Sequence, residues 1–206
     1  MKNPKISYAI LACVELPELQ KLLPFLKEWK KPDDEIVVLL DDICYTAGVE
    51  EVAFKYADRV KHRSLDKDFA SQKNALIDMC EGDYIFNIDA DELPSKYIMA
   101  NLHDVIHENS NVDVFWVPRI NTVDGITDEH VHEWRWRVND HGWVNWPDWQ
   151  MRIFRNNKAI RWKNAVHEIL SGYKMFTHLP EEPEWAILHH KTIDKQEQQN
   201  AFYSSI

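Results

Sequence analysis

The sequence predicts an α/β fold with a mostly parallel central sheet flanked by helices. Apolar, strand-like runs alternate with segments of helical periodicity through the first half of the chain. Residues 6–14 and 35–40 are almost continuously apolar, which is typical of strands buried on both faces. Buried strands that alternate with helices form right-handed βαβ units, and these units place their strands parallel in one sheet.

Helix signals separate the predicted strands. Residues 16–29 carry leucines at helical spacing, and Pro17 lies where the first turn of that helix begins. Thr46 is expected to cap the next helix. Asp66 is expected to cap the helix after it, which Gly82 ends.

Short strands at residues 59–62 and 84–88 complete the first half of the chain, and Pro94 is expected to open its last helix. At 206 residues, the chain is expected to form a single domain. The change in composition after the first half divides that domain into two functional halves, residues 1–110 and 111–206.

Histidine and tryptophan crowd a loop-like stretch of the second half, residues 120–148. Short strands are expected around this stretch, at residues 112–118, 150–154, 159–162 and 185–189, and a polar helix at residues 193–203. Five of the nine tryptophans lie close together here: Trp134, Trp136, Trp143, Trp146 and Trp149.

Charge and composition exclude several classes of protein. The net charge of −10 repels nucleic-acid phosphates, so no nucleic-acid partner is expected. The five glycines are too scattered for a dinucleotide fingerprint or a Walker-type phosphate loop. Cys13, Cys44 and Cys80 predict neither a disulfide framework nor a cysteine zinc site, and they fit a reducing, cytoplasmic location. The longest apolar run, residues 8–14, is too short to span a membrane.

One basic strip interrupts the acidic sequence. Residues 151–163 contain five arginines and lysines and no acid. The strip is either a face for an anionic ligand or a solvated pair of strands, and the sequence favours neither.

Acidic residues follow the predicted parallel strands directly, at the sheet edge where such folds bind ligands. Carboxylates crowded at one edge repel each other unless a cation lies among them. Their hard oxygen atoms favour Mg²⁺ or Mn²⁺, whereas the alternative is that they cap helices and turns. The residues concerned are Glu15, Asp41, Asp42, Asp89 and Asp91.

Several runs in this order resemble the glycosyltransferase family 2 of the GT-A fold, and in particular a bacterial and viral subgroup. The resemblance covers nearly the whole chain and implies a Rossmann-like sheet, a nucleotide-sugar donor half (1–110) and a tryptophan-rich acceptor half (111–206). The runs that carry it are residues 6–15, 37–42, 68–76, 82–92, 148–155, 166–168, 188–191 and 196–203.

The resemblance implies an inverting, metal-dependent hexosyltransferase that acts in polysaccharide biosynthesis. Its donor would be a nucleotide sugar, most often UDP-linked, and its acceptor a glycan, lipid-linked or protein hydroxyl, with contact to a membrane through the acceptor. The implied donor-binding residues are Glu15, Asp41, Asp42, Lys73, Asp89 and Ala90. Asp89, Asp91 and His189 would hold Mn²⁺ or Mg²⁺, and His190 is the adjacent alternative because neighbours on a strand point to opposite faces.

The resemblance leaves open which carboxylate accepts the proton of the acceptor hydroxyl. Glu168 is the first candidate, because His167 beside it could orient substrate, and Asp148 is the second. Either carboxylate has an alternative role in a structural salt bridge. The tryptophans provide either stacking platforms for sugar rings or a small second core.

Two other functions remain as alternatives. A nucleotidyltransferase also needs clustered aspartates and Mg²⁺, but that class usually adds a glycine-rich phosphate loop. A non-catalytic carbohydrate-binding module would use the tryptophans alone, and its sugar binding would survive the substitution Asp91→Ala.

Overall fold

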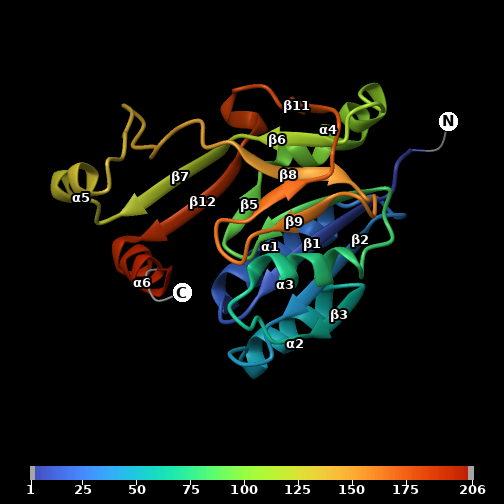
Figure 1. The fold of residues 1–206 in the computed structure, drawn as a ribbon, viewed down its shortest axis with the longest axis horizontal. Helices are drawn as coiled ribbons and strands as arrows, with labels where there is room; N and C mark the ends of the chain where they lie inside the picture. Colours follow the sequence, from blue (N-terminus) through green and yellow to red (C-terminus); the bar gives the residue numbers. More distant parts are fainter. Residues whose placement is uncertain (1–2, 204–206) are drawn as a thin grey trace.

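The computed structural model describes residues 3–203, and a seven-stranded sheet forms its centre (Figure 1). In spatial order the strands are β11 (Phe176–His178), β6 (Val114–Val117), β8 (Gln150–Arg155), β4 (Tyr84–Asp89), β1 (Ile6–Ala12), β2 (Glu35–Leu40) and β3 (Arg59–His62). The strands β1 to β4 run parallel to one another, and β11 runs parallel to β6. Only β8, between β4 and β6, is antiparallel to its neighbours in this described sheet. The predicted α/β fold with a mostly parallel sheet is therefore confirmed.

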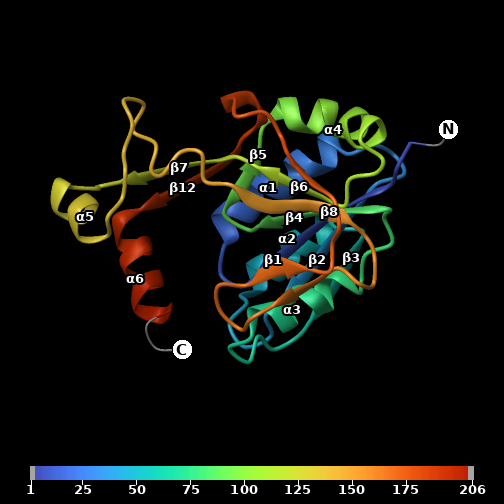
Figure 2. The same ribbon diagram turned by 45° about the horizontal axis from the view of Figure 1, so that its top comes forward.

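Helices cover both faces of this sheet (Figure 2). They are α1 (Leu16–Trp29), α2 (Ala47–Tyr56), α3 (Phe69–Ile77) and α4 (Lys96–Glu108). Tyr8 and Ile10 of β1 share a core with α1, α2 and α4, whereas Ala9 shares a second core with α3. Successive side chains of β1 thus enter opposite cores, which explains why this strand is apolar without alternation.

Two predicted helix starts are confirmed. Pro17 lies in the first turn of α1, where its missing N–H costs nothing. The Thr46 hydroxyl caps α2 by accepting a hydrogen bond from the backbone N–H of Val49 at 3.4 Å.

The predicted limits of α3 are wrong at both ends. Asp68 caps this helix through the N–H of Ser71 at 2.9 Å, while Asp66 lies in the turn before it with a left-handed φ of 50°. The helix ends at Ile77, five residues before Gly82. Gly82 serves a close approach of two segments, since a Cβ atom there would lie 2.6 Å from the backbone nitrogen of Ser7.

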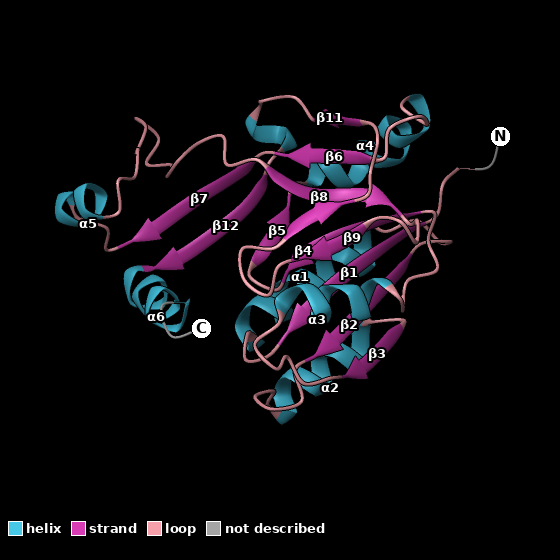
Figure 3. Cartoon of the chain, in the orientation of Figure 1, coloured by secondary structure: helices cyan, strands magenta, loops and turns pink. Residues whose placement is uncertain are grey.

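A three-stranded second sheet continues from the first and carries the chain's last helix (Figure 3). Its strands, in spatial order, are β5 (Glu92–Pro94), β12 (Ile187–Thr192) and β7 (Arg119–Asp124). Pro94 therefore belongs to β5 and does not open a helix, and Ser95 caps α4 instead. The polar helix predicted at residues 193–203 is confirmed as α6 (Ile193–Tyr203).

The predicted loop at residues 120–148 is wrong in its first part. Residues 119–124 form β7, and a short helix α5 (Asp128–Glu133) follows. β7 pairs in parallel with β12, a strand 68 residues away, so its strand character depends on a partner that local pattern does not reveal. The last strand begins at Ile187 and not at residue 185, because Pro183–Trp185 form a short 3₁₀ turn.

The strands predicted at residues 150–154 and 159–162 do not pair with each other. β8 lies in the central sheet, whereas β9 (Arg161–Lys163) pairs with β10 (Ile169–Ser171) in a separate hairpin that packs on α3. Neither β10 nor β11 was predicted. The arginines of the basic strip pair with acids from distant segments, so the strip does not form one anion-binding face.

Cys13 and Cys44 form a disulfide, although the sequence predicted none. Their Cα atoms lie 5.6 Å apart despite a separation of 31 residues. The parallel pairing of β1 with β2 brings the segments after these strands together, and spacing along the chain hides this proximity. Cys80 is buried and is not in a disulfide. Within residues 3–203, no helix combines the length and apolar character needed to cross a membrane.

Candidate active site

A cavity of about 750 Å³ opens at the carboxyl ends of β1, β2 and β4. Residues from α3, both sheets, the β9–β10 hairpin and α6 complete its walls. With the exception of Asp42, the structure places all of the predicted site residues in its lining: Glu15, Asp41, Lys73, Asp89, Ala90, Asp91, Asp148, Glu168 and His189.

Glu15 and Asp41 face this cavity from the ends of β1 and β2. Glu15 Oε2 accepts hydrogen bonds from two backbone N–H groups at 2.8 and 3.0 Å. Asp41 Oδ1 accepts two more from the loops around it, at 3.2 and 3.3 Å. Asp42, by contrast, is exposed, and its carboxylate accepts a hydrogen bond from Ser64 at the surface.

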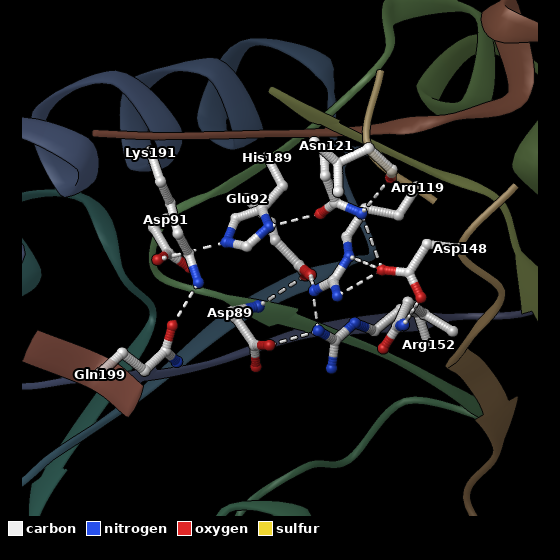
Figure 4. Close-up of polar contacts among 12 residues, drawn as sticks. Asp89, Asp91, Glu92, Arg119, Asn121, Asp148, Arg152, His189, Lys191 and Gln199 are labelled. Carbon is white, nitrogen blue, oxygen red and sulfur yellow. Dashed lines mark hydrogen bonds and ion pairs between the residues drawn. The ribbon is translucent and has the colours of Figure 1, made fainter. Parts of the chain in front are cut away.

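Acids and arginines alternate in a continuous series beside the cavity, in which Glu92 and Arg152 are buried and the other members are partly exposed (Figure 4). Arg152 pairs with Asp89 and, at 2.6 Å, with Glu92. Arg119 pairs with the same Glu92 at 2.8 Å and with Asp148 at 2.6 Å. Glu92 is 1% exposed and joins both arginines, so it fixes the relative positions of Asp89 and Asp148.

These charges keep the aspartate at the end of β4 ionised. Burial alone would raise the pKa of Asp89, but the positive charges of Arg152 and Lys73 bring that pKa well below its ordinary value. Burial likewise favours the neutral form of Arg152, yet Asp89 and Glu92 raise its pKa above the usual range. Asp89 and Arg152 therefore both stay ionised and form an ion pair.

Asp91 lies beside His189 and not beside Asp89 (Figure 4). Asp91 Oδ2 is 3.4 Å from His189 Nε2 and 3.3 Å from Lys195 Nζ. Burial raises the pKa of Asp91, but its contact with His189 and the charge of Lys195 outweigh that effect and hold the pKa far below normal. A carboxylate oxygen and an imidazole nitrogen that lie side by side in the wall of a cavity are a suitable pair of ligands for a transition metal.

The alternation of β12 separates the two adjacent histidines. The side chain of His189 is 8% exposed and points into the cavity. That of His190 is 60% exposed and lies 3.2 Å from Asp124 and 2.9 Å from Thr122 on the opposite face. Between the two, only His189 can meet a ligand of this cavity.

Asp148 is held by several donors at the start of β8. Its Oδ2 accepts hydrogen bonds from Arg119 at 2.6 and 2.9 Å and from Asn121 at 2.9 Å, and its Oδ1 accepts one from Gln150 at 2.8 Å. Burial raises the pKa of Asp148, but the Arg119 charge and these hydrogen bonds lower it overall. Asp148 is thus an ionised carboxylate on the cavity wall.

Glu168 reaches the cavity from the loop between β9 and β10. Its carboxylate forms an ion pair with Lys73 of α3, whose ammonium group also lies 4.6 Å from the ring centre of Trp162. Lys73 is 7% exposed, so this ion pair is shielded from solvent. The residue before Glu168, His167, has a left-handed φ of 54°, which aims the loop end towards α3.

The tryptophan cluster divides between the cavity and its surroundings. Trp136 and Trp149 line the cavity. Trp134 packs edge-on against Trp136, and Trp143 packs edge-on against Trp146, at ring-centre distances of 4.8 and 5.1 Å. Two of the five rings are therefore placed to meet a ligand, and the others support them or each other.

Sequence reasoning missed several residues of this site. Glu92 and Arg119 find their partners 27 to 60 residues away, so no local pattern marks them. Lys191 is nearly buried, donates to Gln199 of α6 and also lines the cavity. Burial lowers its pKa, although the charge of Asp91 opposes this. Lys191 lies in the run 188–191, directly after two histidines that are themselves candidate ligands.

Comparison with known proteins places this fold and site in context. Residues 7–178 match Glycosyl transferase family 2. No curated protein sequence matches the chain. Among solved structures, residues 1–349 of S. aureus TarS in complex with UDP-GlcNAc resemble it with 15% identity and a TM-score of 0.63, over 91% of this chain and 58% of that one.

Two further solved structures are similar to this chain, with different coverage and TM-scores. A second structure of S. aureus TarS has 14% identity and a TM-score of 0.61, over 95% of this chain and 38% of that chain. The mannosyltransferase PcManGT from Pyrobaculum calidifontis, in complex with GDP-Man and Mn²⁺, has 15% identity and a TM-score of 0.48, over 58% of this chain and 36% of that chain. The chain thus spans less than two thirds of the length of TarS 1–349.

At such low sequence identities, the similarity to the TarS structures shows the fold alone, which is the GT-A fold. The family match covers most of the sequence, including the strands β1, β2 and β4 that end at the cavity. The chain belongs to glycosyl transferase family 2.

Proposed function

We propose that this chain transfers a sugar from a nucleotide sugar, with a UDP-sugar as the favoured donor, to an acceptor hydroxyl. The observation that carries the proposal is that Asp91, His189 and Asp148 line one cavity at the carboxyl ends of the parallel strands. A site for a cation and a carboxylate that can take a proton are the two functions that such a transfer needs. The TarS complexes with UDP and UDP-GlcNAc support the choice of donor.

The donor nucleotide would lie along the ends of β1 and β2. Glu15 and Asp41 line the cavity there and offer acceptors for a base and a ribose. Lys73 is the nearby buried cation for the diphosphate, and Ala90 leaves room for the donor beside Asp89. Because Lys73 is paired with Glu168, donor binding would exchange one anionic partner for another.

The donor set of Asp91 and His189 fits a divalent metal ion. Mn²⁺ accepts both carboxylate oxygen and imidazole nitrogen, whereas Mg²⁺ prefers oxygen alone, so we favour Mn²⁺. In this arrangement Asp89 stays with Arg152 and would contact the donor or the metal's remaining ligands. Bound beside the diphosphate, the metal would offset the negative charge that develops on the leaving group.

We favour Asp148 over Glu168 as the proton acceptor. Within the described residues, Asp148 Oδ1 accepts one hydrogen bond, so a lone pair remains for the hydroxyl of an acceptor. Glu168 is neutralised by Lys73 and lies on the α3 side of the cavity. One base and no covalent nucleophile imply a single displacement, which inverts the anomeric configuration.

A carbohydrate is the acceptor that the tryptophans favour. Trp136 and Trp149 line the cavity with aromatic surface, against which the CH faces of a sugar ring can pack. A glycan or a lipid-linked sugar would supply both the ring and the attacking hydroxyl, as in polysaccharide biosynthesis.

A thermal-shift panel tests this function. UDP, UDP-GlcNAc, UDP-glucose and GDP-mannose are each added with Mn²⁺, Mg²⁺ or EDTA, to the wild type and to Asp91→Asn. A ligand at 100 times its Kd stabilises the native state by about 2.7 kcal/mol, or roughly 5–10 °C for a chain of this size. We expect a rise with UDP ligands that needs metal and is lost in Asp91→Asn. A flat panel with folded protein, or a rise that EDTA and the substitution leave unchanged, would reject the proposal.

A further inference from the structure

Asn121 lies between the two halves of the proposed site (Figure 4). It occupies the middle of β7 and is in register with His189 on the parallel strand β12. Its amide nitrogen donates to Asp148 Oδ2 at 2.9 Å and lies 3.4 Å from the carbonyl oxygen of Val144. Its amide oxygen lies 2.7 Å from His189 Nδ1.

The partners of Asn121 fix the orientation of its amide group. The ionised Asp148 and the carbonyl of Val144 can only accept hydrogen bonds, so the NH₂ group must face them. The amide oxygen must then face His189. Because that oxygen can only accept, the proton of the contact lies on His189 Nδ1.

This assignment determines what the other nitrogen of the ring offers. With Nδ1 protonated towards Asn121, Nε2 is the nitrogen that is left for a metal: it donates to the ionised Asp91 in the metal-free protein, and its lone pair becomes available when a metal ion takes the place of that proton. His189 Nε2 is the atom that faces Asp91 Oδ2, at 3.4 Å. The nitrogen that a metal requires therefore lies on the side of Asp91, and Asn121 keeps it there.

We propose that Asn121 is a positioning residue that sets the tautomer of His189 for metal binding and, through its other end, holds Asp148 for the acceptor hydroxyl. The inference rests on the proposed function of the site. The side chain of Asn121 would thus set the distance between the Asp91–His189 pair and Asp148. Asparagine suits this place because it offers an acceptor at one end and a donor at the other, which neither alanine nor aspartate can do.

Two substitutions separate the two contacts of Asn121. Asn121→Ala removes both. Asn121→Asp keeps an oxygen for His189 Nδ1 but sets a carboxylate against Asp148. His190→Gln is the matched control, since His190 is the neighbouring histidine on the exposed face of β12.

The first readout is Mn²⁺ affinity, measured by electron paramagnetic resonance in the presence of UDP. Loss of a group that orients a metal ligand typically weakens binding 10- to 100-fold. We expect that loss in Asn121→Ala, and affinity within about threefold of the wild type in Asn121→Asp and His190→Gln.

The second readout is the ring of His189 itself, followed by ¹⁵N NMR of histidine-labelled protein without metal. The wild type and Asn121→Asp are expected to show a protonated Nδ1, and Asn121→Ala is expected to lose that proton in part, because only Asp91 at Nε2 then remains as a partner of the ring. A merely structural role would not move this signal. Melting curves establish that each variant is folded, and if Asn121→Ala does not fold, Asn121→Asp decides by keeping or losing both signals.

The outcomes distinguish this inference from the function on which it rests. A wild type that binds no Mn²⁺ with UDP would reject the metal site, and the inference with it. A wild type that binds Mn²⁺, with equal affinity and an unchanged histidine signal in Asn121→Ala, would overturn the role of Asn121 alone.

Discussion

As the proposed base, Asp148 would have to meet two opposing requirements. A base needs a free lone pair, yet Arg119 and Asn121 hold one oxygen of this carboxylate tightly. The structure separates these demands between the two oxygens, since Oδ2 takes the strong donors and Oδ1 accepts from Gln150 alone among the described residues. Position is thus secured at one atom while the other stays available for proton transfer.

Asp148→Asn is therefore expected to remove proton transfer without removing donor binding. General-base catalysis contributes about 10²- to 10⁴-fold, so kcat with a UDP-sugar donor should fall by that factor while the Kd for UDP and Mn²⁺ stays the same. Steady-state kinetics and calorimetric titration measure the two quantities. If Glu168→Gln lowers kcat more than Asp148→Asn does, Glu168 is the base and our assignment is wrong.

The lowered pKa of Asp148 predicts how stability depends on pH. The folded-state pKa lies below the ordinary aspartate value of about 3.9, so the ionised form adds stability above that value and loses it as pH falls through the lowered pKa. In metal-free protein, Asp148→Asn should thus have a lower Tm than the wild type at pH 7. The difference should shrink below about pH 4. A Tm difference that stays constant from pH 7 to pH 3 would contradict this assignment.

Some residues of the candidate site can be predicted from the sequence, and others cannot. The sequence singles out Asp91 and His189 as candidates, because one follows a buried strand and the other lies in a run typical of the family. Glu92, Arg119 and Asn121 act only through partners on other strands, and nothing in their local sequence marks them. Ion pairs and hydrogen bonds across a site become visible only when the fold brings the strands together.

At the scale of elements, α3 matters because it carries Lys73 to the cavity. Asp68 caps its first turn, and Asp66 lies in the preceding turn. Asp68→Ala should lower stability by about 1 kcal/mol, or roughly 2–4 °C in Tm. Asp66→Asn, which tolerates a left-handed backbone, should stay within about 0.5 kcal/mol. A larger loss in Asp66→Asn would restore Asp66 as the cap.

The disulfide joins the segment after β1 to the loop after β2, beside Asp41. Asp41 Oδ2 lies 3.3 Å from Cys44 Sγ, so this link helps to shape the end of the cavity where we propose that the nucleotide lies. Of the three cysteines, one should thus react with a thiol reagent in denaturant before reduction, and three after it. Three reactive thiols before reduction would show that the disulfide does not form.

The second sheet explains why elements were harder to predict than the fold. Arg119 and Asn121 of β7 are polar and line the cavity, so the apolar alternation of this strand is weak. It becomes a strand because β12 pairs with it along six residues. The β9–β10 hairpin is similar, since its three-residue strands gain their form from packing on α3.

At the scale of the whole molecule, the parallel sheet brings residues that are far apart in the sequence together at one site. Strands β1, β2 and β4 are neighbours and parallel, so the acids that follow them meet at one edge. This much could be predicted from alternating strands and helices. The wall that we propose for the acceptor could not be predicted, because β7, β8 and β12 come from distant parts of the second half and converge only in the folded chain.

The central claim is that Asp91 and His189 hold a divalent metal ion beside a nucleotide diphosphate. Crystals grown with UDP and Mn²⁺ test it most directly through anomalous scattering at the manganese edge. The account predicts one manganese peak within bonding distance of both Asp91 and His189, with the UDP phosphates beside it and the uracil towards Asp41. Bound UDP without manganese at this pair would contradict it.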